Sequence, residues 1–108
     1  MVFDRDNKMN ELSKYSNFDK VKAAVDIFLK RNMNDDNILL EPSTRKNKKY
    51  MIKGFFTGNK WVHFGQMGYS DYTKHNDEKR RKAFRNRNIR WIERNIYSPA
   101  FLSYILLW

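Results

Sequence analysis

The chain contains no cysteine, which excludes disulfide bonds, thiolate zinc sites and cysteine nucleophiles together. It also lacks any apolar run close to the roughly 18 residues that a membrane-spanning helix needs. Its first charged residues, Asp4, Arg5 and Asp6, interrupt the apolar core that a secretory signal would require. We therefore expect a soluble protein that has no membrane span, is not secreted and needs no covalent cross-link.

The short motifs that mark common enzyme and cofactor sites are absent as well. The sequence has no GxSxG nucleophile elbow, no phosphate-binding glycine loop and no dinucleotide fingerprint. The two histidines, His63 and His75, lie on separate predicted elements, and with Asp71 and Asp77 they give no recognised metal-ligand spacing. The sequence therefore predicts no catalytic residue, no metal site and no cofactor, and an enzyme acting on nucleic acid is the weakest functional hypothesis.

The chain does have enough apolar material for one core. Of its 108 residues, 41% are hydrophobic and 16% are aromatic, which suffices for a single compact domain. Residues 1–16 are polar and show no periodicity, so we expect an arm that is loose or ordered only against a partner. Residues 17–108 are expected to form one basic α+β domain.

Helix signals predict the first and last elements of this domain. Asn17 is the expected N-cap of a helix that reaches residue 31, with apolar residues at helical spacing: Phe18, Val21, Val25, Phe28 and Leu29. A second helix should begin around Asn76 and run to about Asn95. Ser98 followed by Pro99 is typical of a capped helix start and predicts a third helix in the last residues.

Between these helices the pattern favours a β-hairpin or a small antiparallel sheet. Residues 38–40 predict a short strand ended by Pro42, and residues 50–56 and 60–64 predict two strands joined by a turn. Gly54 indicates a bulge or a close backbone approach. The hairpin aromatics either pack in the core or stack on exposed bases, and core packing is favoured: Tyr50, Phe55, Phe56, Trp61 and Phe64.

Acidic residues are scarce in the second part of the chain. Residues 1–44 hold seven Lys/Arg and eight Asp/Glu, a net charge of −1, whereas residues 45–108 hold fifteen and four, a net charge of +11. Solubility alone does not require the two signs to separate along the chain. The asymmetry therefore predicts a polyanionic partner for residues 45–108.

The second predicted helix carries most of this charge. At about 100° per residue, five of its cations share one sector of roughly 100° on the helix. The basic segment at residues 45–49, before the predicted hairpin, adds three more cations. These eight residues are the predicted polyanion-binding or nucleic-acid-binding site: Lys79, Arg80, Arg87, Arg90, Arg94, Lys46, Lys48 and Lys49. The alternative is a solvated charged face.

The other side of the same helix is predicted to pack against the rest of the domain. Its apolar residues gather there: Phe84, Ile89, Trp91, Ile92 and Ile96. Arg81 and Arg85 also point to this side, where we expect them to meet carboxylates such as Asp71 or Asp77, because unpaired buried charges are costly.

Residues 100–108 are apolar apart from Ser103, and we expect a helix that one small sheet cannot cover completely. Part of it should face another chain. The predicted interface residues are Phe101, Leu102, Ile105, Leu106 and Trp108.

A string of residues in the second part of the chain resembles a known family. It comprises His63-Phe64-Gly65, Gly68-Tyr69, Asp71-Tyr72-Thr73, His75, Asp77, Arg80 and Arg87. This string is similar to one in a family of short basic proteins encoded by giant and other large DNA viruses, with relatives in some phages. The closing run, 103–108, is similar to the end of that family, so the resemblance covers about residues 48–108.

The resemblance implies a virion or DNA-associated role and no catalytic activity. One departure is Arg87-Asn88, where family members often carry Arg-His, and it argues against histidine-dependent chemistry. The residues themselves favour a structural role for the motif. Gly65 and Gly68 permit tight turns, Asp71 and Thr73 can bond nearby backbone, and the tyrosines at 69 and 72 can cover the core.

Two functional hypotheses follow. The first is a non-enzymatic structural protein of a large DNA virus, either a minor capsid protein or an internal virion component, whose basic helix binds acidic protein or packaged DNA. It would reside in the virion, and in the host cytoplasm or nucleus during assembly, as a subunit of an oligomer or larger assembly. The second is a free nucleic-acid-binding protein acting in viral DNA replication, packaging or expression. The partners are other virion proteins, nucleic acid or both.

Overall fold

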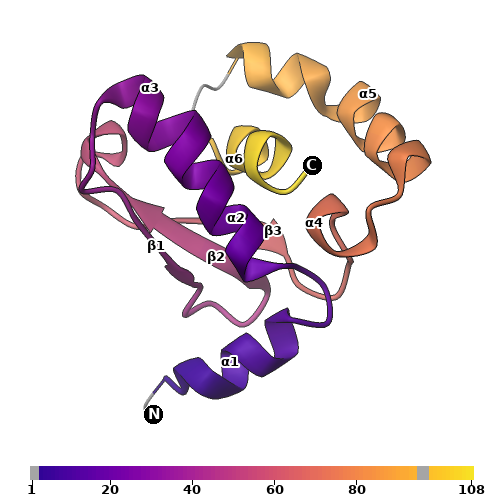
Figure 1. Ribbon diagram of the computed structural model, residues 1–108, viewed down its shortest axis with the longest axis horizontal. Coiled ribbons are helices and arrows are strands. Elements are labelled where there is room, and N and C mark those ends of the chain that lie inside the picture. Colours follow the sequence, from indigo (N-terminus) through magenta and orange to yellow (C-terminus); the bar gives the residue numbers. More distant parts are fainter. Residues whose placement is uncertain (1–2, 95–97) are drawn as a thin grey trace.

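The computed structural model describes residues 3–94, the last four by their helical backbone only, and residues 98–108. The predicted α+β class is confirmed: helices surround a three-stranded antiparallel sheet of order β1-β2-β3 (Figure 1). The strands are β1 (Leu39–Pro42), β2 (Lys48–Lys53) and β3 (Val62–Gln66). Within the described residues, no helix combines the length and the apolar character that crossing a membrane demands.

The predicted hairpin is confirmed as the pair β2 and β3, in which Tyr50 lies opposite Phe64 and both side chains are fully buried. The strand predicted at 38–40 is β1, which begins one residue later and includes Pro42 at the sheet edge, where a missing N–H is tolerated. A Cβ at Gly54 would lie 3.0 Å from Cγ1 of Ile38, so the close backbone approach is also confirmed.

The helix predicted from Asn17 is present as three joined segments, α2 (Phe18–Val25), the π-helical η1 (Asp26–Lys30) and α3 (Arg31–Met33). The Asn17 side chain caps it by accepting the Lys20 N–H at 3.2 Å. The four-residue spacing of Val21, Val25 and Leu29 buries all three. Phe28 does not join this apolar face as predicted, because that spacing leaves it on the flank, 49% exposed.

The last helix, α6 (Pro99–Leu106), begins as predicted, with Ser98 Oγ accepting the Phe101 N–H at 3.2 Å. It lies in the middle of the molecule, between α2, α5 (Glu78–Arg94) and the sheet (Figure 1). The prediction of an interface is wrong for Leu102 and Leu106, which are 0% and 2% exposed in the core of this same chain. Three elements cover α6 rather than one sheet. Phe101, Ile105 and Trp108 are half-buried.

The prediction that residues 1–16 are loose or ordered only against a partner is also wrong for the part of this segment that the structure describes, residues 3–16. Residues Arg5–Leu12 form the helix α1, which packs against β1 and buries Leu12. Lys8 Nζ donates to the carbonyl oxygens of Arg45 at 2.9 Å and Lys48 at 2.6 Å. Because Lys8 and Leu12 are the only residues of Arg5–Leu12 that are buried, the sequence shows no apolar periodicity there.

Candidate polyanion-binding site

The basic helix α5 begins just after a short helix, α4 (Tyr72–His75). The Asp77 carboxylate caps α5 by accepting the N–H groups of Lys79 at 3.0 Å and Arg80 at 3.3 Å. Asn76 has a left-handed backbone with φ of 55° and ends α4, so α5 starts at Glu78 and not around Asn76. The predicted end near Asn95 lies outside the described residues.

The outward face of α5 carries its cations in solvent. Exposed side chains on this face are Lys79, Arg80, Lys82, Arg87 and Arg90. Among the described residues, none of these five side chains has a recorded ion pair or hydrogen bond. From Lys79 to Arg90 the face extends about 16 Å at 1.5 Å per residue. The side chain of Arg94 lies outside the described residues.

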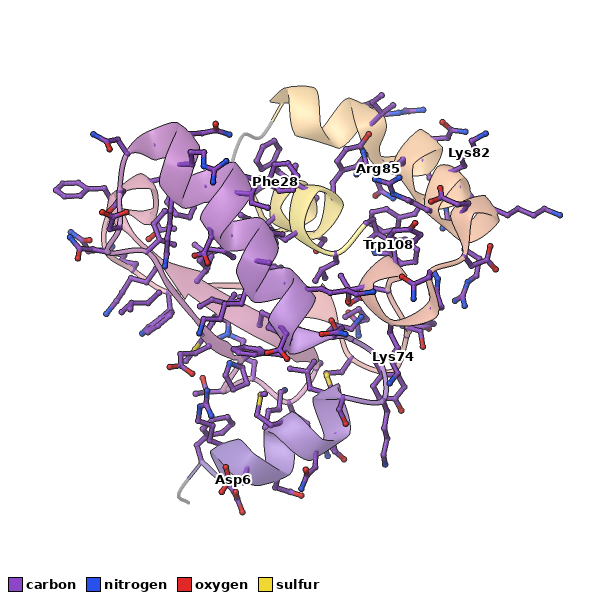
Figure 2. All side chains as sticks on the ribbon, in the orientation of Figure 1. Asp6, Phe28, Lys74, Lys82, Arg85 and Trp108 are labelled. Carbon is purple, nitrogen blue, oxygen red and sulfur yellow. The ribbon has the colours of Figure 1, made fainter. Side chains whose placement is uncertain are left out.

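The inward arginines are tied to α6 instead of to the predicted aspartates. Nε of Arg81 and Nε of Arg85 both donate to the main-chain oxygen of Trp108, at 2.6 and 3.1 Å. Figure 2 shows Arg85 turned toward Trp108, whereas Lys82 points away from the body of the protein. Arg81 also reaches Glu78 at 3.7 Å, a carboxylate of its own helix. The prediction of partners at Asp71 or Asp77 is therefore wrong.

The packing side of α5 is only partly as predicted. Phe84 is half-buried and stacks on Trp108, with ring centroids 4.4 Å apart and an interplanar angle of 8°. Ile89 is 50% exposed, because it lies beyond the strip of α5 that contacts α6. The side chains of Trp91, Ile92 and Ile96 lie outside the described residues.

Lys49 is wrongly placed among the polyanion-binding residues. Its side chain is 3% exposed, and its ammonium lies 3.0 Å from the carboxylate of Asp71, which is fully buried. Burial lowers the pKa of Lys49, while the charge of Asp71 and its hydrogen bond oppose that shift. Of the other two lysines that were predicted to bind a polyanion from segment 45–49, Lys46 is exposed and Lys48 is half-buried. These two stay available to a partner.

The aspartate of the loop motif is the centre of a buried polar network. Asp71 accepts the N–H of Thr73 at 3.1 Å and also the Thr73 hydroxyl. The same hydroxyl oxygen accepts the N–H of Asn17 at 2.9 Å, and Ser16 Oγ accepts the hydroxyl of Tyr50 at 2.6 Å. Burial raises the pKa of Tyr50. The network joins the start of α2 to the sheet, which gives this part of the motif a structural role.

The glycines and tyrosines of the motif also have defined positions. Gly68, with φ of 93°, lies in the turn after β3 as predicted, whereas Gly65, with φ of 80°, lies within β3 and not in a turn. Tyr72 is half-buried. Cζ of the Arg81 guanidinium lies over the Tyr72 ring, 4.8 Å from the ring centroid. Tyr69 is 69% exposed and does not cover the core as predicted, because the turn at Gly68 directs the chain outward.

A cavity of about 540 Å³ opens beside the basic face, between α5, α6 and the loop that follows β3. Four basic residues line it, Lys48, Lys49, Arg80 and Arg87, of which Lys49 is paired with Asp71. Three aromatic side chains line it as well: Tyr69, Phe84 and Trp108. The described lining contains no aspartate or glutamate. Sequence reasoning missed this cavity, since no local pattern joins α6 to β2 and α5.

Both histidines make hydrogen bonds through Nδ1. His63 Nδ1 and the Ser43 hydroxyl are 2.6 Å apart, and His75 Nδ1 accepts the N–H of Asp77 at 2.9 Å. The other ring nitrogen of His75, Nε2, is buried with no recorded hydrogen-bond partner among the described residues. Burial is the main cause that lowers the pKa of both histidines, and neighbouring cations, Arg45 and Arg80 respectively, add to it.

We expect the protein to lose stability as the pH falls through 6.5, the ordinary pKa of histidine. Because the pKa values of His63 and His75 are lowered in the folded state, the unfolded state binds protons first, and proton uptake favours unfolding. Thermal melts between about pH 5 and 8 measure this effect. His75→Asn keeps an acceptor for the Asp77 N–H, and its melting temperature should vary less with pH. An unchanged pH dependence in this variant would contradict the prediction for His75.

Comparison with known proteins identifies one partial match. Residues 38–88 match the model of a family of unknown function (DUF5754). The matched segment contains the sheet, the network residues Lys49, Tyr50, Asp71 and Thr73, and α5 as far as Asn88, but not Ser16, Asn17 or α6. No curated protein and no solved structure matches the chain significantly. The family description states neither an activity nor a source, so the viral resemblance stays a prediction.

Proposed function

We propose that this protein binds the phosphate backbone of nucleic acid through the outward face of α5 and catalyses no reaction. A contrast within one helix carries the proposal. Arg81 and Arg85 both donate to the main-chain oxygen of Trp108, whereas the cations on the outward face are exposed and pair with no carboxylate among the side chains that the structure describes. Exposed cations without acidic neighbours attract polyanions over several ångströms of solvent.

Nucleic acid fits this face better than a scattered set of acidic side chains does. The outward cations follow a straight helix for about 16 Å, which corresponds to roughly five steps of the 3.4 Å phosphate repeat along one strand. Arg80, Arg87 and Arg90 bring the two-pronged guanidinium geometry that matches phosphate oxygens. A face of this kind reads charge rather than base sequence.

The second candidate is a non-enzymatic structural protein of a large DNA virus, a minor capsid or internal virion component with other virion proteins as partners. The resemblance at residues 63–87 supports it, and so do exposed apolar side chains that a neighbour could cover: Ile27, Phe28, Leu39, Phe55 and Ile89. However, α1 and α6, which were the expected docking segments, pack into the fold of this chain. The structure therefore gives the nucleic-acid binder the stronger support.

Binding of duplex DNA by the full chain should fall steeply with salt and differ little between unrelated sequences. Replacing Lys79, Lys82 and Arg90 with Gln should make the slope of log affinity against log salt shallower by about 0.9 for each phosphate that is no longer bound, close to 3 in total. Fluorescence anisotropy at several salt concentrations gives this slope.

A matched control removes the same charge elsewhere. Lys14, Lys22 and Lys60 are exposed and lie outside α5, so their replacement with Gln should leave the slope nearly unchanged. Equal effects of the two triple variants would mean that net charge and not the α5 face binds DNA. A strong preference for one sequence with a flat salt response would reject backbone binding.

A further inference from the structure

The cavity beside α5 combines two kinds of wall. On one side are Arg80 and Arg87, which are seven residues apart and therefore on the same side of the helix. Lys48 adds a third cation from β2. None of these three side-chain cations has a recorded partner among the described residues. An anionic group in the cavity would meet donors that are not already occupied.

The other wall is aromatic and held in place. Phe84 and Trp108 are stacked nearly parallel, and the main-chain oxygen of Trp108 accepts hydrogen bonds from both Arg81 and Arg85. Because α5 and α6 are tied together at this point, the position of the Trp108 ring is fixed before any ligand arrives. Tyr69 adds a third, largely exposed ring at the cavity lining.

Polar groups between the two walls offer further hydrogen bonds. The Asn88 amide nitrogen donates to the carbonyl oxygen of Phe84 at 2.8 Å, which leaves its amide oxygen directed elsewhere. Ser103 and Gln66 also line the cavity. A volume of about 540 Å³ lies inside the roughly 300–1,000 Å³ range of small-molecule sites.

We propose that this cavity binds a nucleotide, with the phosphate on Arg80, Arg87 and Lys48 and the base against the aromatic wall. A purely cationic site would suit phosphate alone and a purely aromatic site would suit an apolar molecule, but this cavity presents both within one volume. The nucleotide is either free or an unpaired unit of a single strand, since a paired base is not available for stacking. This inference rests on the proposed function, whose α5 face adjoins the cavity.

Three probes separate the contributions of the two walls. The full chain, labelled with ¹⁵N, is titrated with AMP, with adenosine and with inorganic phosphate. AMP should bind at least about tenfold more tightly than phosphate or adenosine, since only AMP engages both walls. Chemical shifts should change at Ser103, Asn88 and the indole N–H of Trp108. Equal affinity for AMP and phosphate, or shift changes confined to other residues, would overturn the proposal.

A pair of charge-matched variants tests the location. Ala83 lines the cavity between Arg80 and Arg87, whereas Asn86 is exposed on the same helix outside it. Ala83→Glu should weaken AMP binding at least about tenfold, because its carboxylate can pair with both arginines. Asn86→Glu, with the same net charge, should retain most of the AMP affinity. Equal affinities in the two variants would place AMP outside the cavity.

An uncharged variant tests the cavity by filling it, and thermal melts check that the variant is folded. Ser103→Leu adds bulk inside the cavity without changing the charge, and it should also abolish AMP binding while thermal melts confirm that the chain is folded. If Ser103→Leu melts like the wild type and binds AMP equally well, the cavity is not the site.

A competition experiment identifies the source of the nucleotide. Measured together with duplex binding, it also distinguishes failure of the cavity proposal from failure of the proposed function. Displacement of AMP by a single-stranded oligonucleotide, at concentrations where the duplex of equal length does not displace it, assigns the cavity to an unpaired nucleotide. Binding of AMP without such displacement assigns it to a free nucleotide. Absent AMP binding with intact duplex binding overturns the cavity proposal alone, and AMP binding without duplex binding overturns the proposed function alone.

Discussion

Replacing Asp71 with Asn should destabilise the protein by about 3–5 kcal/mol, the usual cost of removing one partner of a buried ion pair. Asn has nearly the same shape, so the loss comes from charge rather than from a cavity. The carboxylate is fully buried and the Lys49 ammonium nearly so, which means that the variant would leave an uncompensated cation inside the fold. Since small domains are stable by only about 5–15 kcal/mol, much of the stability would be lost.

Urea denaturation of the two proteins measures the difference, and the chain supplies a matched control. Asp26 and Lys30 are also 3.0 Å apart, but at the surface, where a pair contributes about 0–1 kcal/mol. Asp26→Asn should therefore change little. Adding Lys49→Met to Asp71→Asn should restore part of the stability, because the orphaned charge is removed. If Asp71→Asn cost no more than Asp26→Asn, the buried pair would have to be hydrated.

Features of the fold that depend on neighbouring residues could be predicted from the sequence. Asn17 and Ser98 each accept a backbone N–H three residues later, so the cap and the start of the helix lie within one short segment. The hairpin is also local, since only residues 54–61, which include the 3₁₀ helix η2 (Phe55–Thr57), separate β2 from β3. The outward face of α5 follows from the helical period alone, which correctly separates exposed Arg87 from half-buried Arg85.

Features that depend on distant residues could not be predicted in this way. Lys49 looks like a surface cation in a basic stretch, and only its contact with Asp71, 22 residues away, makes its burial possible. Arg81 and Arg85 donate to the main-chain oxygen of Trp108, 27 and 23 residues away, although the sequence offers nearer acceptors at Asp71 and Asp77. The cavity has the same origin, because its walls come from β2, α5 and α6.

The buried pair and the candidate site share a structural element. Lys49 lines the cavity, while its ammonium pairs with the buried carboxylate of Asp71. The loop between β3 and α4 carries Tyr69 at the cavity lining and Asp71 in the network. Loss of the Asp71 charge would therefore disturb the cavity as well as the core, so variants at Asp71 test stability and not ligand binding.

Replacing Leu102 with Ala should cost about 2–5 kcal/mol, because Leu102 is fully buried where α6 contacts α2, α5 and β3, and truncation leaves a void. This result would distinguish a core residue from an interface residue. A core substitution lowers the melting temperature equally at every protein concentration, whereas loss of an interface makes the change depend on concentration.

Phe101→Ala is the matched control, since Phe101 is the half-buried neighbour on the same helix. It removes a larger side chain, yet it should cost less than Leu102→Ala because less of its surface is withdrawn from water. Thermal melts at several protein concentrations, together with sedimentation of the wild type and both variants, measure the two effects. A larger loss for Phe101→Ala, or a melting temperature for Leu102→Ala that rises with concentration toward that of the wild type, would place α6 at an interface between chains.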